Sequence, residues 1–176
     1  MGFLKYNSGA SKIDRPKIEV PRTRIDYALE ILAAIGVFLG LYELLVNYSA
    51  LPASIPTHFN FKGEVDSWGS KETILILGAG IIVVHVVLTF VSRIPNMYNF
   101  PWEITKENAP RQYRLARTFI TLLKTEIVWL FAAIVSETVK VALGQSNQMQ
   151  PSNLYLFLGL ITTSVVGYFI VSYRAR

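Results

Sequence analysis

The chain has 176 residues, 52% of them hydrophobic, and a formal net charge of +5 at pH 7. The hydrophobic residues gather in runs too long for the interior of one soluble domain, which excludes an ordinary soluble protein. Without cysteine the chain has no disulfide framework and no thiolate metal site, and we expect no cofactor. The basic residues are distributed like a membrane topology signal, so we expect no nucleic-acid partner.

Four predominantly apolar runs reach the roughly 18 residues needed to cross a bilayer core of about 30 Å. They span residues 27–48, 73–92, 118–142 and 154–173. Each is expected to be a helix, because backbone polar groups inside a bilayer need partners within their own segment. The first run is longer than the apolar core of a signal peptide and follows a polar segment, which argues against a cleaved signal. The sequence therefore predicts an all-α integral membrane protein, a single domain built as a four-helix bundle.

Residues 1–26 form a basic segment ahead of the first run. Pro16 and Pro21 interrupt it, so we expect it to be extended. The simplest interpretation is that its charges fix the membrane topology; the alternative is adhesion to anionic lipid head groups, at about 1 kcal/mol per basic residue. Its basic residues are Lys5, Lys12, Arg15, Lys17, Arg22 and Arg24.

The basic residues divide unevenly between the two sides of the predicted bundle. Six lie in residues 1–26, five in residues 93–117 and two at the C-terminus, thirteen in all, whereas the other side has only Lys62 and Lys71. The positive-inside rule then predicts a protein of the cytoplasmic membrane with both termini and the 93–117 connector in the cytoplasm. Residues 49–72 and 143–153 are expected outside.

The connector of residues 93–117 is rich in aromatic residues at first and basic afterwards. Thr105 is a candidate N-cap, and a basic helix is expected to begin near Ala109 and continue into the third run. Arg111, Arg114 and Arg117 would form one stripe on it, either an interfacial anchor or a docking surface for an acidic cytoplasmic partner. The candidate residues here are Asn99, Pro101, Glu103, Thr105, Asn108, Gln112, Arg114 and Arg117.

Ionisable residues inside the four runs are costly in a bilayer and therefore need partners. The candidates are Glu30, Glu43, His85, Lys124, Glu126, Glu137 and Lys140. At about 1.5 Å rise per residue, Glu30, His85, Lys124 and Glu126 fall at similar depths, and we expect Lys124 to pair with Glu30 or with a Glu126 from a neighbouring face. Glu43, Glu137 and Lys140 form a second group, in which Glu137 and Lys140 are spaced to pair.

Small residues within the runs are expected to allow close helix packing. Gly36 and Gly40 have the G-x-x-x-G spacing in the first run, and Gly78 and Gly80 lie in the second. The last run contains Gly159, Thr162, Thr163, Ser164 and Gly167, which we expect to serve the same purpose.

The loop of residues 49–72 carries the densest set of polar and turn-forming residues. Residues 56–60 should be extended and residues 61–64 should turn, with Ser70 as the candidate N-cap of the second helix. His58 and Asp66 are expected to hydrogen-bond across the Gly63 turn and brace the loop. The alternatives are acid–base chemistry or a metal at this pair, but we find no nucleophile and assign no metal or catalytic residue. The loop candidates are Pro56, Thr57, His58, Phe59, Asn60, Gly63, Asp66, Trp68, Gly69, Ser70 and Lys71.

The loop sequence L-P-x-x-I-P-T-H-F-N-x-x-G-x-x-D-x-W-G-S-K resembles the signature of a family of bacterial membrane domains, domain of unknown function 1648 (DUF1648). That family includes the SdpI-type immunity proteins, which protect cells from a secreted toxin. The stretch N-F-P-W-E-I-T-K-E-N-A-P-R-Q-Y-R-L-A-R is similar to the connector of small, four-helix members. The resemblance implies a non-enzymatic immunity or sensor protein against membrane-active peptides.

Three functions therefore remain to be compared. In the first, the loop contacts an external peptide while the connector docks a cytoplasmic regulator or membrane partner. In the second, the chain is a transporter subunit that uses Glu30, His85, Lys124 and Glu126. The third is an outward-facing hydrolase centred on His58 and Asp66.

Overall fold

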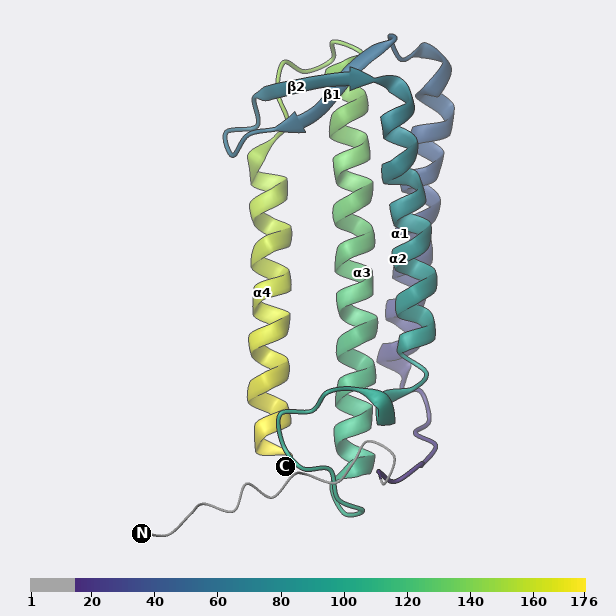
Figure 1. Ribbon diagram of the computed structural model, residues 1–176, viewed down its shortest axis with the longest axis vertical. Coiled ribbons are helices and arrows are strands. Elements are labelled where there is room, and N and C mark those ends of the chain that lie inside the picture. Colours follow the sequence, from purple (N-terminus) through teal and green to yellow (C-terminus); the bar gives the residue numbers. More distant parts are fainter. Residues whose placement is uncertain (1–14) are drawn as a thin grey trace, which may run out of the picture.

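The computed structural model describes residues 15–176, so the predictions for Lys5 and Lys12 lie outside the described residues. The structure has four long helices, and a two-stranded sheet lies at one end of them (Figure 1). The helices are α1 (Arg24–Asn47), α2 (Ile74–Val91), α3 (Ala109–Ala142) and α4 (Pro151–Arg174), and the strands are β1 (Ser54–Phe59) and β2 (Val65–Ser70). Of residues 15–176, 67% are helical. Each helix is long and apolar enough to cross a membrane, which confirms the predicted all-α class.

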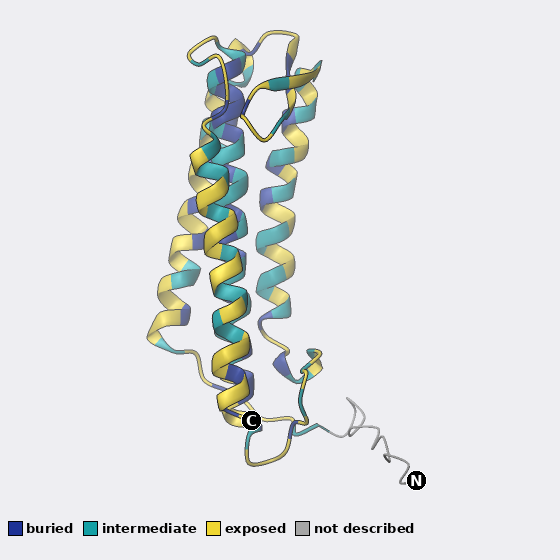
Figure 2. Ribbon diagram, turned by 90° about the vertical axis from the view of Figure 1, so that its left-hand side faces the viewer, coloured by how far each residue is buried: buried dark blue, intermediate teal, exposed yellow. Residues whose placement is uncertain are grey.

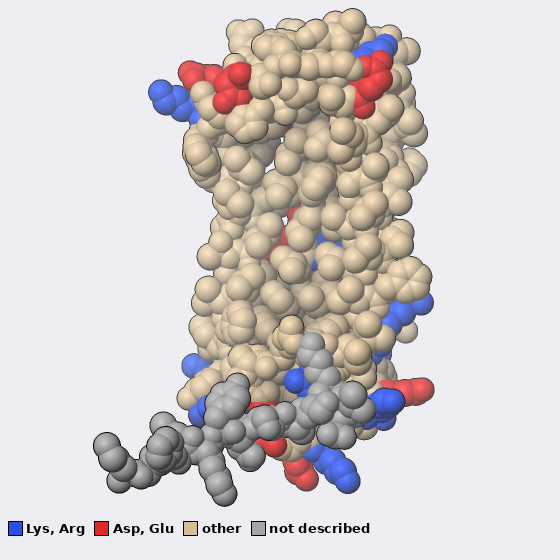
Figure 3. All heavy atoms as spheres, viewed as in Figure 1, with Lys and Arg blue, Asp and Glu red and all other residues tan. Residues whose placement is uncertain are grey.

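We call the end with the β-hairpin the hairpin end, and the end with residues 92–108 the connector end. Figure 3 shows that the acidic and basic side chains gather at these two ends. The band between them is largely uncharged, apart from a few charged atoms at mid-height. This distribution matches a bundle whose middle lies in hydrocarbon.

Helix α3 is the axis of the bundle, and the other three helices pack around it. It contributes fifteen buried residues, and no large hydrophobic side chain of α3 is exposed. The exposed large hydrophobic side chains on the bundle belong to α1, α2 and α4, as the burial colours of Figure 2 illustrate. In a bilayer these outward apolar faces contact lipid, so α3 alone is surrounded by protein.

The seam between α1 and α3 is closed by polar side chains of α3 and by glycines of α1. Thr125 and Trp129 donate hydrogen bonds to backbone carbonyls of α1 at 3.1 and 3.0 Å. Gly40 faces α3 and α2 so closely that an added Cβ would lie 2.8 Å from Ile81 and 3.0 Å from Ala132. Close backbone approach and interhelical hydrogen bonds hold membrane helices together, and the expected packing role of the α1 glycines is confirmed.

Helix α4 packs less tightly than the sequence predicts. A Cβ added at Gly159 or Gly167 would meet nothing within 4 Å, so the expected close packing at these glycines is wrong. Thr162 and Thr163 bond to carbonyls of their own helix at 2.7 and 2.8 Å. The reason is rotational: α4 turns Ser164 toward α3, and its glycines face outward.

The helix starts differ in part from the predicted caps. Helix α3 begins at Ala109, as expected, but its N-cap residue is Asn108 and not Thr105. Thr105 instead caps the preceding turn, where its backbone N–H and side chain exchange hydrogen bonds with Asn108. Ser70 is also not a side-chain cap: its hydroxyl bonds to the Glu72 carboxylate, and a short 3-10 turn (Lys71–Thr73) precedes α2. In both cases the side chain bonds to a residue two or three positions ahead, and not to the first turn of the following helix.

At the connector end a small apolar cluster covers the start of α3. It contains Val20, Ile104, Ala109 and Tyr113, with the aromatic rings of the connector packed against it. The aromatic connector residues therefore form local core here, which fixes residues 15–23 and 92–108 around the base of α3.

Candidate functional site

The hairpin turn is organised by Asn60. Its side-chain oxygen accepts hydrogen bonds from the backbone N–H groups of Lys62 and Glu64 at 2.8 and 3.1 Å. Its amide nitrogen donates to the Glu64 carboxylate at 2.8 Å. Gly63 completes the turn with φ of +82°, in the left-handed region that favours glycine. Asn60 thus supplies hydrogen-bond partners for the polar groups of the turn, which makes the hairpin tip rigid.

His58 and Asp66 lie across the two strands from each other. The imidazole Nδ1 is 2.5 Å from a carboxylate oxygen of Asp66, so the predicted bond across the Gly63 turn is confirmed. The register is irregular at Thr57, whose hydroxyl donates to Ser67 at 3.2 Å. A bulge of this kind redirects the side chains that follow it. Here the register pairs His58 with Ser67, and the His58 ring reaches the carboxylate of the neighbouring Asp66.

This pair is exposed, with 68% of the His58 side chain and 44% of the Asp66 side chain accessible. An exposed ion pair contributes little to stability, so its position matters more than its energy. The described partner of the His58 ring is the Asp66 carboxylate, while Ser67 accepts a hydrogen bond from Thr57. Within residues 15–176, no three His, Cys, Asp or Glu gather as metal ligands.

The hairpin tip is fastened to the turn between α3 and α4. The backbone N–H of Met149 donates to the Gly63 carbonyl at 2.9 Å, and the Tyr155 hydroxyl donates to the Phe61 carbonyl at 2.9 Å. A Cβ on Gly63 would overlap the backbone of Met149. The hairpin therefore lies as a fixed cap from α2 across α3 to the start of α4 (Figure 1).

Glu137 holds the same turn from the α3 side. It is only 4% exposed, and its carboxylate accepts from Lys140 Nζ at 3.0 Å and from the backbone N–H of Gln150 at 3.0 Å. The predicted Glu137–Lys140 pair is confirmed. Glu43 is in no ion pair among the described residues.

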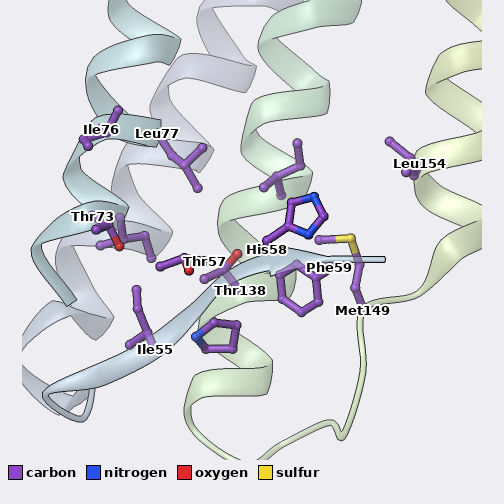
Figure 4. A pocket seen from close by; sticks show the side chains of 13 residues that line it. Ile55, Thr57, His58, Phe59, Thr73, Ile76, Leu77, Thr138, Met149 and Leu154 are labelled. Carbon is purple, nitrogen blue, oxygen red and sulfur yellow. The ribbon is translucent and has the colours of Figure 1, made fainter. Parts of the chain in front are cut away.

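Beneath the cap is a pocket of about 400 Å³. Its roof is the signature strand of residues 55–59, its floor is Ile134 and Thr138 of α3, and its walls are α2 and the start of α4. Figure 4 shows the pocket between Leu77 of α2 and Leu154 of α4, with the His58 ring between these two side chains. The lining is almost wholly apolar, apart from His58 and three threonines. Such a cavity suits an apolar ligand that is oriented by one polar group.

A second polar cluster lies in the middle of the bundle. The side chain of Lys124 is fully buried, and its Nζ donates to Glu30 at 2.6 Å and to Thr89 of α2 at 2.9 Å. The predicted pairing of Lys124 with Glu30 is confirmed. His85 lies within electrostatic range of both residues, and its Nδ1 is buried without a described hydrogen-bond partner.

Glu126 does not belong to this cluster. It points toward α4, where the Ser164 hydroxyl donates to one carboxylate oxygen at 2.6 Å. Its other oxygen is buried and has no described partner. The two-residue separation from Lys124 turns the two side chains to different sides of α3, as the helical period requires.

The connector candidates divide into exposed and buried residues. Arg117 turns inward and donates to the carbonyls of Val20 and Ser92, so the expected stripe of three arginines is reduced to Arg111 and Arg114. Gln112 is buried and exchanges hydrogen bonds with Ser172 of α4 at 2.9 and 2.6 Å. Gln112 therefore holds α3 to α4, and Arg117 fastens the segments before α1 and after α2 to α3. The exposed candidates are Asn99, Pro101, Glu103, Thr105 and Arg114.

Several partners at these sites were not singled out from the sequence. Thr89 and Ser172 are polar residues within apolar runs, and this signal could have indicated interhelical hydrogen bonds. Tyr155 and Met149 give no such signal, because they bond to the hairpin tip and the sequence does not show where the tip lies.

Comparison with known proteins finds a family match for the hairpin region. Domain of unknown function (DUF1648) matches residues 34–84, from the middle of α1 through the hairpin into α2. An uncharacterised protein of Archaeoglobus fulgidus is 41% identical over 71 residues, which is 36% of this chain and 38% of the archaeal protein. No solved structure matches the chain. The chain therefore carries a DUF1648 domain, whose hairpin forms the cap over the pocket.

Proposed function

We propose that the chain is a non-enzymatic protein of the cytoplasmic membrane, with both termini inside, that recognises membrane-active peptides at its hairpin end. The observation that carries the proposal is the pocket of about 400 Å³ roofed by the signature strand. An apolar side chain of a peptide lying at the membrane surface fits this lining. The polar part of the peptide would then face His58 and Asp66.

The rigidity of the cap supports recognition over a merely structural loop. Asn60, Gly63 and Tyr155 fix the hairpin through bonds within its turn and to its neighbours. A pre-organised pocket costs less ordering entropy when a ligand binds. Phe61 is 80% exposed and Trp68 is 58% exposed on the same cap, where they offer apolar contact to a peptide or to the interface.

The exposed part of the connector is a surface through which a cytoplasmic regulator would sense the ligand. Arg111 and Arg114 present two positive charges there, and Glu103 and Glu107 of the same connector are also exposed. This mixed surface fits a partner with charges of both signs better than a purely acidic one.

The first test is growth inhibition by a panel of membrane-active peptides. Strains with the wild-type gene, with a deletion and with His58→Ala/Asp66→Ala are compared after protein levels have been checked. We expect the deletion and the well-expressed hairpin variant to be more sensitive to at least one peptide. Unchanged sensitivity of the deletion to every peptide would contradict the proposal.

The pocket itself is tested with a filling variant and a matched control on the same helix. Leu154→Trp places a large ring at the pocket wall, whereas Leu156→Trp adds the same ring at a position that is 60% exposed. Loss of protection in the first variant and retention in the second would locate recognition in the pocket. Equal protection in both would exclude the pocket as the ligand site.

A transporter subunit is the second candidate, favoured by the buried cluster of Lys124, Glu30, Thr89 and His85. Four helices are few for a transporter, so a larger assembly would be needed. Proton-coupled flux in liposomes that is lost in His85→Ala and Lys124→Ala, but kept in the exposed control Val83→Ala, would support it. Flux that is indifferent to the first two changes would remove it.

A further inference from the structure

A second cavity lies at the connector end, away from the hairpin pocket. It has a volume of about 320 Å³ and lies where the segment before α1 meets the segment after α2. Arg22, Arg93 and Arg117 line it, and among residues 15–176 Glu19 is the only acidic residue in the lining. The lining thus carries an excess of two positive charges in a small space.

Arg117 forms the structural centre of this cavity. Its guanidinium donates to the carbonyls of Val20 and Ser92, which tie both walls to α3. The guanidinium carries five N–H donors in a planar fork, so two backbone contacts leave donors for a further acceptor. A fixed arginine of this kind is suited to binding a phosphate oxygen.

Arg22 and Arg93 complete the positive lining from two separate segments. Arg22 lies over the Tyr27 ring at 6.0 Å, and Arg93 lies over the Phe90 ring at 5.6 Å. These cation–π contacts limit the movement of both side chains. None of the three arginines is in an ion pair with a carboxylate among residues 15–176.

The position of the cavity selects the kind of anion. It lies just before the first residue of α1 and just after the last residue of α2, which are two candidate membrane spans. This is the depth of the lipid head groups. Ile18, Phe90 and Ile94 are exposed beside or within the lining, at 37%, 63% and 50%, and offer apolar contact to acyl chains.

We infer that this cavity, the arginine pocket of Arg22, Arg93 and Arg117, binds the phosphate of an anionic phospholipid. The phosphodiester lies among the three guanidinium groups, and the acyl chains follow the exposed apolar side chains into the bilayer. Basic pockets between membrane helices are suited to such head groups. The lipid also bridges the segments before α1 and after α2.

The test uses the full chain purified in detergent, with phosphatidylglycerol and phosphatidylcholine of identical acyl chains as probes. Bound lipid is counted by native mass spectrometry, and the thermal midpoint is followed in parallel. We expect phosphatidylglycerol to bind more tightly and to raise the midpoint more than phosphatidylcholine does. Equal effects of the two lipids would overturn the inference. An equal rise with inorganic phosphate alone would show that the site takes free phosphate and would overturn the lipid assignment.

Two charge-removing variants distinguish a defined lipid site from a general attraction of anionic lipid to positive charge. Arg22→Gln/Arg93→Gln leaves the structural Arg117 in place and is expected to weaken phosphatidylglycerol binding by about thirtyfold, at about fivefold per charge. Arg111→Gln/Arg114→Gln removes the same charge from exposed positions outside the pocket, and its binding should stay near that of the wild type. Equal weakening in both variants would overturn the inference.

A gain-of-binding variant keeps the test independent of folding losses. Glu19→Gln removes the negative charge that the described residues contribute to the lining, so phosphatidylglycerol should bind about fivefold more tightly. Unchanged or weaker binding in this variant would contradict a phosphate among the three arginines.

Discussion

Replacing Lys124 by methionine is expected to destabilise the bundle strongly. The side chain of Lys124 is fully buried, and its Nζ bonds to Glu30 at 2.6 Å and to Thr89 at 2.9 Å. Removing one partner of a buried ion pair costs about 3–5 kcal/mol, and the lost interhelical hydrogen bond adds about 0.6 kcal/mol. Methionine nearly conserves the volume, so the loss reports on the uncompensated Glu30 carboxylate and not on a cavity.

Glu30→Gln, which removes the other partner, is predicted to lower the free energy of unfolding more than the Lys124 change does. Glu30→Gln leaves Lys124 charged with no exposed side-chain surface, whereas the Glu30 side chain retains 20% exposure. The double variant removes both charges, so we expect it to recover most of the stability that either single change loses.

The assay is reversible unfolding of the four proteins in mixed detergent micelles, from which a double-mutant cycle gives the coupling free energy. We expect a coupling of at least about 3–5 kcal/mol, because a double variant that recovers most of the lost stability makes the coupling exceed the cost of one single change. Val83→Ala, at an exposed position of α2, serves as the control for lipid-facing changes. A coupling below about 0.5 kcal/mol would refute the reasoning, because the pair would then behave as two independent residues.

Three further changes test the packing and the pH response. Gly63→Ala should lower the thermal midpoint by more than Gly144→Ala: both glycines have positive φ, at a cost of about 1–2 kcal/mol each, but only Gly63 also meets neighbouring backbone. Equal shifts would show that the hairpin tip is not in contact with the turn. Gly40→Ala should destabilise the α1–α3 seam by about 1–3 kcal/mol, whereas Gly159→Ala at an open position should stabilise by about 0.4–1 kcal/mol, as measured by denaturant titration. The same sign for both changes would contradict the packing difference. Burial raises the pKa of the Tyr98 phenol above its ordinary value of about 10, so folding favours its protonated form, and stability is lost as the pH rises above that ordinary value. Tyr98→Phe should therefore lose less stability than the wild type between about pH 9 and pH 11 in parallel unfolding curves, and identical losses would refute the assignment.

Some of the site followed from local sequence alone. The pairing of Lys124 with Glu30 could be predicted because rise per residue fixes depth, and two opposite charges at one depth in hydrocarbon have few other partners. The bond between His58 and Asp66 could be predicted because the Gly63 turn brings the flanking residues together within a few positions.

Other parts depended on which way a side chain turns. Arg117 was expected on an exposed stripe and Glu126 beside Lys124, but Arg117 bonds to backbone carbonyls and Glu126 faces α4. Gln112 was expected in the connector without a partner, and it bonds to Ser172 of α4. Helical spacing gives relative directions on one helix, but it does not give the rotation of that helix against the others. That rotation decides whether an arginine faces a partner protein or a backbone carbonyl.

The sequence by itself determined the four helices, their approximate ends and the extended course of the loop. These features depend on the length and composition of continuous segments, and backbone hydrogen bonding in a bilayer leaves helices as the only form for such segments. Only the tertiary structure decided that the loop is a hairpin fastened to the α3–α4 turn, that it roofs a pocket, and that three arginines from separate segments share a cavity. These features join residues far apart in the chain, and the packing of the whole bundle around α3 brings them together.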